Sequence, residues 1–247
     1  MKAINTILSI ALALCLASCN GIFSGIYDEA PDDKELQQGF TPSDNTGKRY
    51  KLLLDATSYK HWHYINLNNW SLETKVIPTE LTGTWDGKSG FSYHEVLGSS
   101  YTLLSFTETD PQEDAAEWQF AVHHFEARTN KGAVIETQYT SIAQLPAAST
   151  FNDKEFTADV WSTTDVLYDL TGMLAYHIGY QNSSVNQVLS RWVNMDFSTP
   201  PPVYTQSGKV YIVRTAEGKY AALQLLNYMS PTGSKGYLTI DILYPYE

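Results

Sequence analysis

The residue with the most distinctive chemistry is Cys19, which follows the small residues of Leu16-Ala17-Ser18. Lys2 supplies a positive charge, and the apolar run Ile7–Leu16 that follows is too short to span a bilayer. This pattern predicts that residues 1–18 form a signal segment whose removal leaves Cys19 as the new N-terminal residue. Its thiol and amine can then carry several acyl chains, which together form a stable membrane anchor. The alternative is an ordinary signal peptide with a cysteine at this position by chance.

Two pairs of histidines stand close in the sequence, and one of them could supply metal chemistry. His61 and His63 are two residues apart and would share one face of a strand, as a metal pair requires. Such a pair more often flanks a buried aromatic residue or lies at a surface, so both interpretations stay open. His123 and His124 would point to opposite faces, so a flat strand cannot bring them into one site.

No pattern of an enzyme stands out in this sequence. It contains no GxGxxG, phosphate-binding loop, GxSxG or HExxH. Aspartate and glutamate are common, but their spacing marks no acid–base pair. We therefore predict a binding protein rather than an enzyme and name no catalytic residue.

The composition favours strands and limits the partners. Of 247 residues, 17 are Tyr, 6 are Trp and 9 are Phe. Cys15 lies inside the predicted signal segment, so Cys19 alone remains, and neither a disulfide framework nor a thiolate metal cluster is expected. A net charge of −11 argues against nucleic acid and against docking on anionic lipid. No other stretch is long enough for a transmembrane helix, so the lipid on Cys19 is the only membrane attachment that we predict.

The chain divides into a tether and one domain. Residues 19–48 are predicted to be a flexible acidic tether, because they are poor in apolar residues. Residues 49–247 alternate with period two and predict a single all-β, mainly antiparallel domain. Its expected strands are Lys51–Ala56, Trp62–Leu67, Trp118–Arg128 with Val134–Tyr139 as partner, and a closing meander of Val210–Thr215, Tyr220–Tyr228 and Tyr237–Tyr244. Only Asn182–Trp192 could form a short helix.

Three blocks of the sequence carry a family resemblance as a set. They are Tyr59–Leu67, Trp118–Asn130 and Val210–Pro245, the last with Glu217-Gly218 and Lys235-Gly236 at its turns. Together they resemble the HmuY-type haem-binding lipoproteins of the Bacteroidetes. The resemblance covers most of residues 52–245. It implies a multi-sheet HmuY-like fold and a surface lipoprotein that binds haem and passes it to a TonB-dependent outer-membrane receptor for iron acquisition.

The resemblance also implies where the haem iron is held. In that family two axial side chains hold the iron, and they are either histidines or methionines. The matching regions here are 168–177, which contains Met173 and His177, and 192–199, which contains Met195 and no histidine. These three residues are the axial ligand candidates. Haem iron accepts both thioether and imidazole, although methionine also fills gaps in cores.

The second region departs from the family pattern. It resembles the methionine-type pattern WxxMDMSTMPP, but Phe197 and Pro200 stand where that pattern has methionines. Apolar aromatic walls suit a porphyrin, and those available near both regions are Tyr168, Tyr176, Trp192, Phe197 and Tyr204. Stacking without a strong ligand, or binding of another tetrapyrrole, stays open. The alternative function is an HmuY-fold surface recognition or adhesion module that has lost axial haem ligation.

Overall fold

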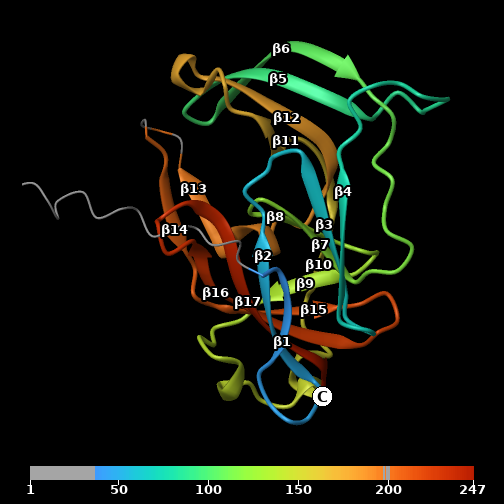
Figure 1. The fold of residues 1–247 in the computed structure, drawn as a ribbon, viewed down its shortest axis with the longest axis vertical. Helices are drawn as coiled ribbons and strands as arrows, with labels where there is room; N and C mark the ends of the chain where they lie inside the picture. Colours follow the sequence, from blue (N-terminus) through green and yellow to red (C-terminus); the bar gives the residue numbers. More distant parts are fainter. Residues whose placement is uncertain (1–36, 197, 199–200) are drawn as a thin grey trace, which may run out of the picture. The chain divides into compact units, whose positions relative to one another are not determined.

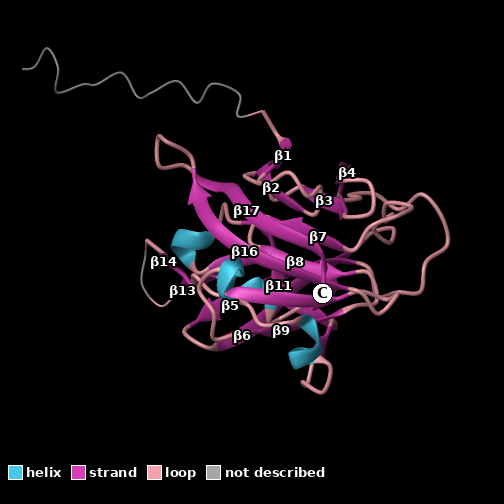
Figure 2. Cartoon of the chain, turned by 90° about the horizontal axis from the view of Figure 1, so that it is seen from below, coloured by secondary structure: helices cyan, strands magenta, loops and turns pink. Residues whose placement is uncertain are grey.

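The computed structural model describes residues 37–196, 198 and 201–247, and the description below leaves out the turn at 231–233. The fold is all-β, as predicted, with antiparallel pairing throughout its described ladders (Figures 1 and 2). Four sheets are present among these residues. The seven-stranded sheet has the order β1 (Gly39–Pro42), β2 (Arg49–Asp55), β17 (Lys235–Tyr246), β16 (Tyr220–Met229), β15 (Val210–Arg214), β9 (Ala133–Glu136) and β10 (Thr157–Ala158).

The remaining sheets are smaller. One four-stranded sheet, called the middle sheet here, has the order β4 (Ser71–Val76), β3 (His61–Asn66), β7 (Phe120–His123) and β8 (Glu126–Thr129). A second, called the upper sheet after its place in Figure 1, has the order β11 (Val160–Asp169), β12 (His177–Val185), β5 (Gly90–Leu97) and β6 (Ser100–Glu108). A two-stranded hairpin joins β13 (Val193–Asp196) and β14 (Val203–Gln206).

The middle sheet is covered on both faces. Ile65 on β3 packs in one cluster with Leu52 and Val213 of the seven-stranded sheet. Trp62 on the same strand packs in another cluster with Phe91 of the upper sheet. Successive side chains of a strand point to opposite faces, so both faces of β3 require apolar residues. This explains why β3, β7 and β8 are buried almost throughout.

Short 3₁₀ turns are the only helical elements among the described residues (Figure 2). Two of them pack with the outer face of the seven-stranded sheet, where they cover Val210 and Ile212. The four turns are η2 (Ile142–Gln144), η3 (Ala148–Phe151), η4 (Met173–Ala175) and η5 (Leu189–Trp192). No helix in the described part of the chain has the length and apolar character needed to cross a membrane.

The closing meander is confirmed as β15, β16 and β17, but the strand predicted over Trp118–Arg128 is wrong. That segment folds back on itself as the β7–β8 hairpin, whose two-residue turn contains His124. His124 adopts the left-handed region with φ of 52°, and its Nδ1 lies 2.9 Å from the carbonyl oxygen of Ala56. The predicted partner strand instead forms β9, which pairs with β15 in another sheet.

Two further boundaries differ from the prediction. β1 lies inside the range assigned to the tether, because Phe40 packs edge-on against Tyr50 and Trp70 and so joins the sheet. The predicted helix 182–192 continues β12 as far as Val185, and only its last part turns as η5. The Asn186 side chain explains this turn, since its Oδ1 accepts a hydrogen bond of 3.0 Å from the Leu189 N–H.

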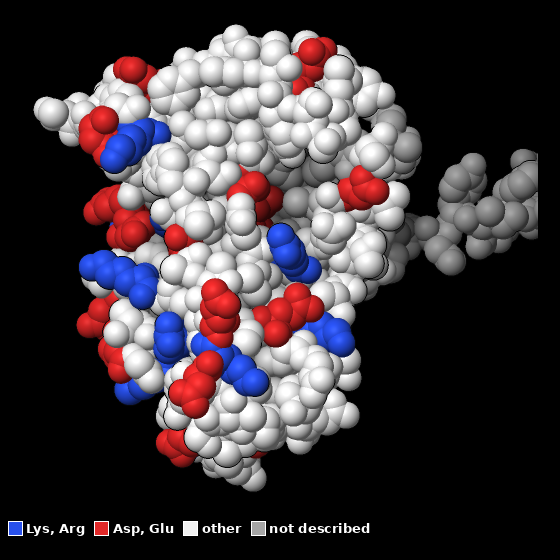
Figure 3. Space-filling view, turned by 180° about the vertical axis from the view of Figure 1, so that it is seen from behind, with Lys and Arg blue, Asp and Glu red and all other residues white. Residues whose placement is uncertain are grey.

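The edge strand β6 of the upper sheet is exposed along its whole length. All nine residues are exposed, and four of them are the large apolar residues Tyr101, Leu103, Leu104 and Phe106. The upper part of the molecule in Figure 3, at the height of β5 and β6 in Figure 1, shows few charged side chains. This part of the surface is therefore exposed, apolar in places and poor in charged side chains.

Candidate functional site

The first predicted ligand region forms the turn between β11 and β12, called the β11–β12 tip here (Leu170–Tyr176). Asp169 Oδ1 accepts a hydrogen bond of 2.9 Å from the Thr171 N–H and starts the turn. Gly172 allows its close return, because a Cβ there would lie 2.8 Å from the His177 carbonyl oxygen. The tip ends at Tyr176, whose φ is 60° and whose carbonyl accepts from the Val96 N–H at 2.8 Å.

The candidate ligands of this tip differ in exposure. Met173 is half-buried at the start of η4, and His177 is exposed at the first position of β12, opposite Glu95 on β5. The tip also exposes apolar surface, since Leu174 is 83% exposed and Tyr176 is 41% exposed. Burying such surface against an apolar ligand is favourable.

The second predicted region forms β13. Met195 is half-buried and lies directly opposite Tyr204 on β14. The Tyr204 ring in turn meets Phe125 edge-on, with ring centroids 5.8 Å apart. Val203, beside Tyr204, is 54% exposed and adds apolar surface to this hairpin. Phe197 lies outside the described residues, as do Cys19 and the predicted signal segment.

The structure brings Met195 to the base of the β11–β12 tip. Met195 and Leu170 both pack against one cluster of the upper sheet, formed by Val96, Leu167, Ile178 and Tyr180. In Figure 1 the tip and the β13–β14 hairpin lie on the same side of the molecule. The two regions that the resemblance singled out are therefore neighbours through this cluster, although about twenty residues separate them in the chain.

Two predicted wall residues lie elsewhere. Tyr168 belongs to the cluster between the middle and upper sheets, where it stacks on Phe91 with centroids 3.8 Å apart. Lys60 Nζ lies 3.0 Å from the centre of the same ring. Trp192 is completely buried, and its Nε1 donates a 2.7 Å hydrogen bond to the carbonyl oxygen of Phe125. Trp192 thus anchors the start of β13 to the β7–β8 turn.

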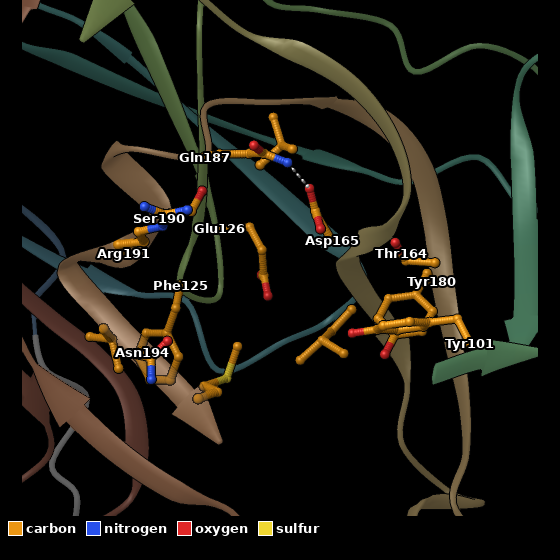
Figure 4. Close-up of a pocket in the computed structure, with 14 residues that line it drawn as sticks. Tyr101, Phe125, Glu126, Thr164, Asp165, Tyr180, Gln187, Ser190, Arg191 and Asn194 are labelled. Carbon is orange, nitrogen blue, oxygen red and sulfur yellow. Dashed lines mark hydrogen bonds between the residues drawn. The ribbon is translucent and has the colours of Figure 1, made fainter. Parts of the chain in front are cut away.

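A cavity of about 280 Å³ lies beside Met195, and sequence reasoning did not find it. Its apolar lining includes Leu167 and Phe125, and its polar lining includes Glu126, Asp165 and Tyr180 (Figure 4). These residues come from β8, β11 and β12 and from the β7–β8 turn. The one signal in the sequence is Glu126, a charged residue within Trp118–Arg128, for which the sequence predicts one continuous strand.

Of the two histidine pairs, His63, His123 and His124 are buried and His61 is half-buried. His63 Nδ1 lies 2.9 Å from Thr74 Oγ1, and its ring centroid is 6.2 Å from that of His61. His124 Nε2 lies 3.0 Å from the Tyr59 hydroxyl, and burial lowers the pKa of His124. Among the described residues no three His, Cys, Asp or Glu side chains are grouped to hold a metal ion.

Comparison with known proteins assigns the chain to a family. The family model described as HmuY protein matches residues 58–242, which include both ligand regions. The chain belongs to the HmuY family. No match was found among curated proteins.

Solved structures agree with this membership of the HmuY family. A candidate lipoprotein of Bacteroides fragilis is 31% identical, with a TM-score of 0.65 over 85% of this chain and 96% of that one. A candidate HmuY-like haem-binding protein of Bacteroides vulgatus is also 31% identical, with a TM-score of 0.63 over 85% of this chain and all of that one. The apo HmuY analog of Tannerella forsythia shares the fold at 22% identity, with a TM-score of 0.59 over 78% and 94%.

Proposed function

We propose that this protein binds haem and is a binding protein rather than an enzyme. The observation that carries the proposal is the HmuY family match, which spans both hairpins. The similar Bacteroides vulgatus protein described as HmuY-like and haem-binding supports it. The residues present fit such a ligand, because Leu174, Tyr176 and Val203 expose apolar surface beside soft sulfur donors.

The donors that we propose for the iron are Met173 and Met195, with His177 as the alternative partner. When bound, haem supplies an iron centre that accepts thioether and imidazole donors. Met173 and His177 stand on the β11–β12 tip, and Met195 stands on β13. Tyr176 lies on the β11–β12 tip and Tyr204 lies opposite Met195, so these two rings are the proposed porphyrin walls.

Absorbance titration with haem, in oxidised and reduced forms, tests the proposal. We expect a Soret band that saturates for the unmodified protein. The double variant Met173→Leu/Met195→Leu keeps side-chain volume but removes both sulfurs, so it should bind at least about tenfold more weakly and change the reduced spectrum. Met229→Leu on β16 is the matched control and should behave as the unmodified protein.

Two outcomes would contradict these assignments. A double variant with unchanged affinity and spectrum would exclude the methionines and direct attention to His177, which His177→Leu then tests. Absence of any saturable spectral change in the unmodified protein would overturn haem binding altogether. The alternative of a surface recognition module with the HmuY fold would then be favoured, as Phe197 and Pro200 in the second region already indicate.

We also propose that Cys19 carries a lipid that anchors the protein to the outer membrane, facing the cell exterior. The similarity to a candidate lipoprotein supports this location. Labelling cells with a fatty-acid analogue should mark the protein, and Cys19→Ser should abolish the label. Protease added to intact cells should degrade the anchored protein if it faces outward, and survival of the protein would contradict surface exposure.

Delivery of haem to a TonB-dependent outer-membrane receptor completes the proposed role. The exposed β11–β12 tip would let a receptor reach the ligand without unfolding the core. Haem-dependent growth of cells that lack the protein should slow, and growth should be restored by the unmodified gene but less by the double methionine variant. Equal growth of all three strains would contradict the delivery role.

A further inference from the structure

Glu126 is a buried carboxylate with one oxygen left over. It is the first residue of β8 and is 3% exposed. Its Oε2 lies 3.1 Å from Nδ1 of His123, which is completely buried. Its Oε1 is also buried and has no hydrogen-bond partner among the described residues. A buried acceptor without a donor is costly, so this oxygen requires one from outside the described protein groups.

His123 does not supply the hydrogen-bond donor that Glu126 Oε1 lacks. His123 Nε2 lies 3.1 Å from the carbonyl oxygen of Tyr59, which can only accept, so Nε2 carries a hydrogen. His123 Nδ1 faces Glu126 Oε2, so neither ring nitrogen of His123 is left to donate to Glu126 Oε1.

Glu126 points into the cavity beside Met195. Figure 4 shows its side chain directed between Phe125 and Asn194 on one side and Tyr101 and Tyr180 on the other. The cavity, of about 280 Å³, is large enough for a small organic molecule. Glu126 is the buried carboxylate of its lining.

The charges of the lining favour a cation. Asp165 adds a second carboxylate, held at Oδ2 by a 3.1 Å hydrogen bond from Gln187 Nε2. Arg191 is the one Lys or Arg in the lining, and its side chain is exposed. Burial and then Tyr101 raise the pKa of Tyr180, and Glu126 and Asp165 add smaller contributions. Carboxylates beside this aromatic wall disfavour an anion and favour a positive group over the ring.

We infer that this cavity binds a small organic ammonium ion, which donates an N–H to Glu126 Oε1 while its apolar body packs against Leu167 and Met195. A charged donor to a buried carboxylate oxygen makes a strong hydrogen bond. The inference rests on Glu126 Oε1 and not on haem, although β11 and β12 also carry the β11–β12 tip and Met195 is a proposed iron donor. The ligand also differs chemically from haem, because the carboxylates of a haem molecule would be repelled here.

The test is a protein-observed NMR titration of the unmodified, haem-free protein with butylammonium, butanol and butyrate. These probes share their chain length and differ in the charge at one end. We expect saturable shifts at Thr164, Tyr180 and Glu126 with butylammonium, several-fold weaker binding of butanol and none of butyrate. Shifts of equal strength with all three probes, or shifts confined to other residues, would overturn the inference.

Variants of Glu126 and Asp165 test whether their carboxylates bind the ammonium ion. Glu126→Gln should weaken butylammonium binding about tenfold, and Asp165→Asn should weaken it less. Asp165 is half-buried and does not belong to the His123 pair, so this second variant decides the matter if Glu126→Gln does not fold. The matched control is Glu136→Gln, an exposed position on β9 that should bind as the unmodified protein. Loss of binding in the control, or full binding in Asp165→Asn and any folded Glu126→Gln, would contradict the inference.

Discussion

Replacing Trp192 by Phe should be among the most damaging conservative changes in this domain. Trp192 is completely buried, and its Nε1 donates a 2.7 Å hydrogen bond to the Phe125 carbonyl oxygen. Phenylalanine cannot donate, so that carbonyl loses its side-chain donor inside the core, at a cost of about 1–3 kcal/mol. Removing the second ring adds roughly 1 kcal/mol of lost packing. The free energy of unfolding should therefore fall by about 2–4 kcal/mol.

Urea unfolding followed by far-ultraviolet circular dichroism measures this loss without depending on tryptophan fluorescence. The matched control is Trp161→Phe on β11, where half of the side chain is exposed. It should change the free energy of unfolding by less than about 0.5 kcal/mol. Equal losses in the two variants would refute the reasoning, because the cost would then follow residue type rather than burial and hydrogen bonding. A Trp192→Phe protein as stable as the unmodified one would refute it as well.

Three further predictions concern pH, a turn and a buried amide. Burial lowers the pKa of His63 from 6.5 to about 4, so stability from its neutral form is fully present above pH 6.5 and is lost as pH falls toward 4. This loss is roughly 3 kcal/mol, and His63→Gln should reduce the pH dependence seen in urea unfolding at pH 7 and pH 4; an unchanged dependence would contradict it. Gly172→Ala should distort the β11–β12 tip, because its Cβ would lie 2.8 Å from the His177 carbonyl oxygen; haem affinity should drop more than about tenfold, and an unaltered titration would show that the tip is not used. Asn186→Ala removes hydrogen bonds of 2.9 Å to the Thr157 carbonyl oxygen and to Asp159. It should lower the free energy of unfolding by about 2–4 kcal/mol. A loss below about 1 kcal/mol would show that water can replace the amide and would contradict the prediction.

The closing meander could be predicted because its signals are local. β15 and most of β16 are apolar runs, and Gly218 takes a φ of 77° in the turn between them. The β7–β8 turn could not be predicted in the same way. His124 is not a typical turn residue, and its left-handed backbone is held by contacts with Ala56 and Tyr59, which lie far away in the sequence. β6 was also missed, because a strand exposed on every residue buries no face that a pattern could reveal.

The site could be predicted only where a family pattern marked it. The resemblance led to Met173, His177 and Met195, and the structure shows that Met195 and the base of the β11–β12 tip share one cluster. It could not lead to the cavity beside Met195. Burial of Glu126 arises from the meeting of β8, β11 and β12, and a single sequence does not reveal which distant strands will meet. The position of Tyr168 against Phe91 is likewise set by packing between two sheets.

In the β11–β12 tip, the side chains at the end of the turn differ from the groups whose hydrogen bonds hold its shape. The Tyr176 carbonyl accepts from Val96, and the His177 N–H donates to Gly172 at 3.0 Å, so main-chain hydrogen bonds and the Asp169 side chain hold the turn without Met173's side chain. A change at Met173 alters what the tip presents and leaves these bonds in place. Natural selection can therefore exchange the proposed iron donor between thioether and imidazole at little cost in foldability. Descendants of one scaffold can in this way diverge in the ligand that they hold while inheriting the same strands.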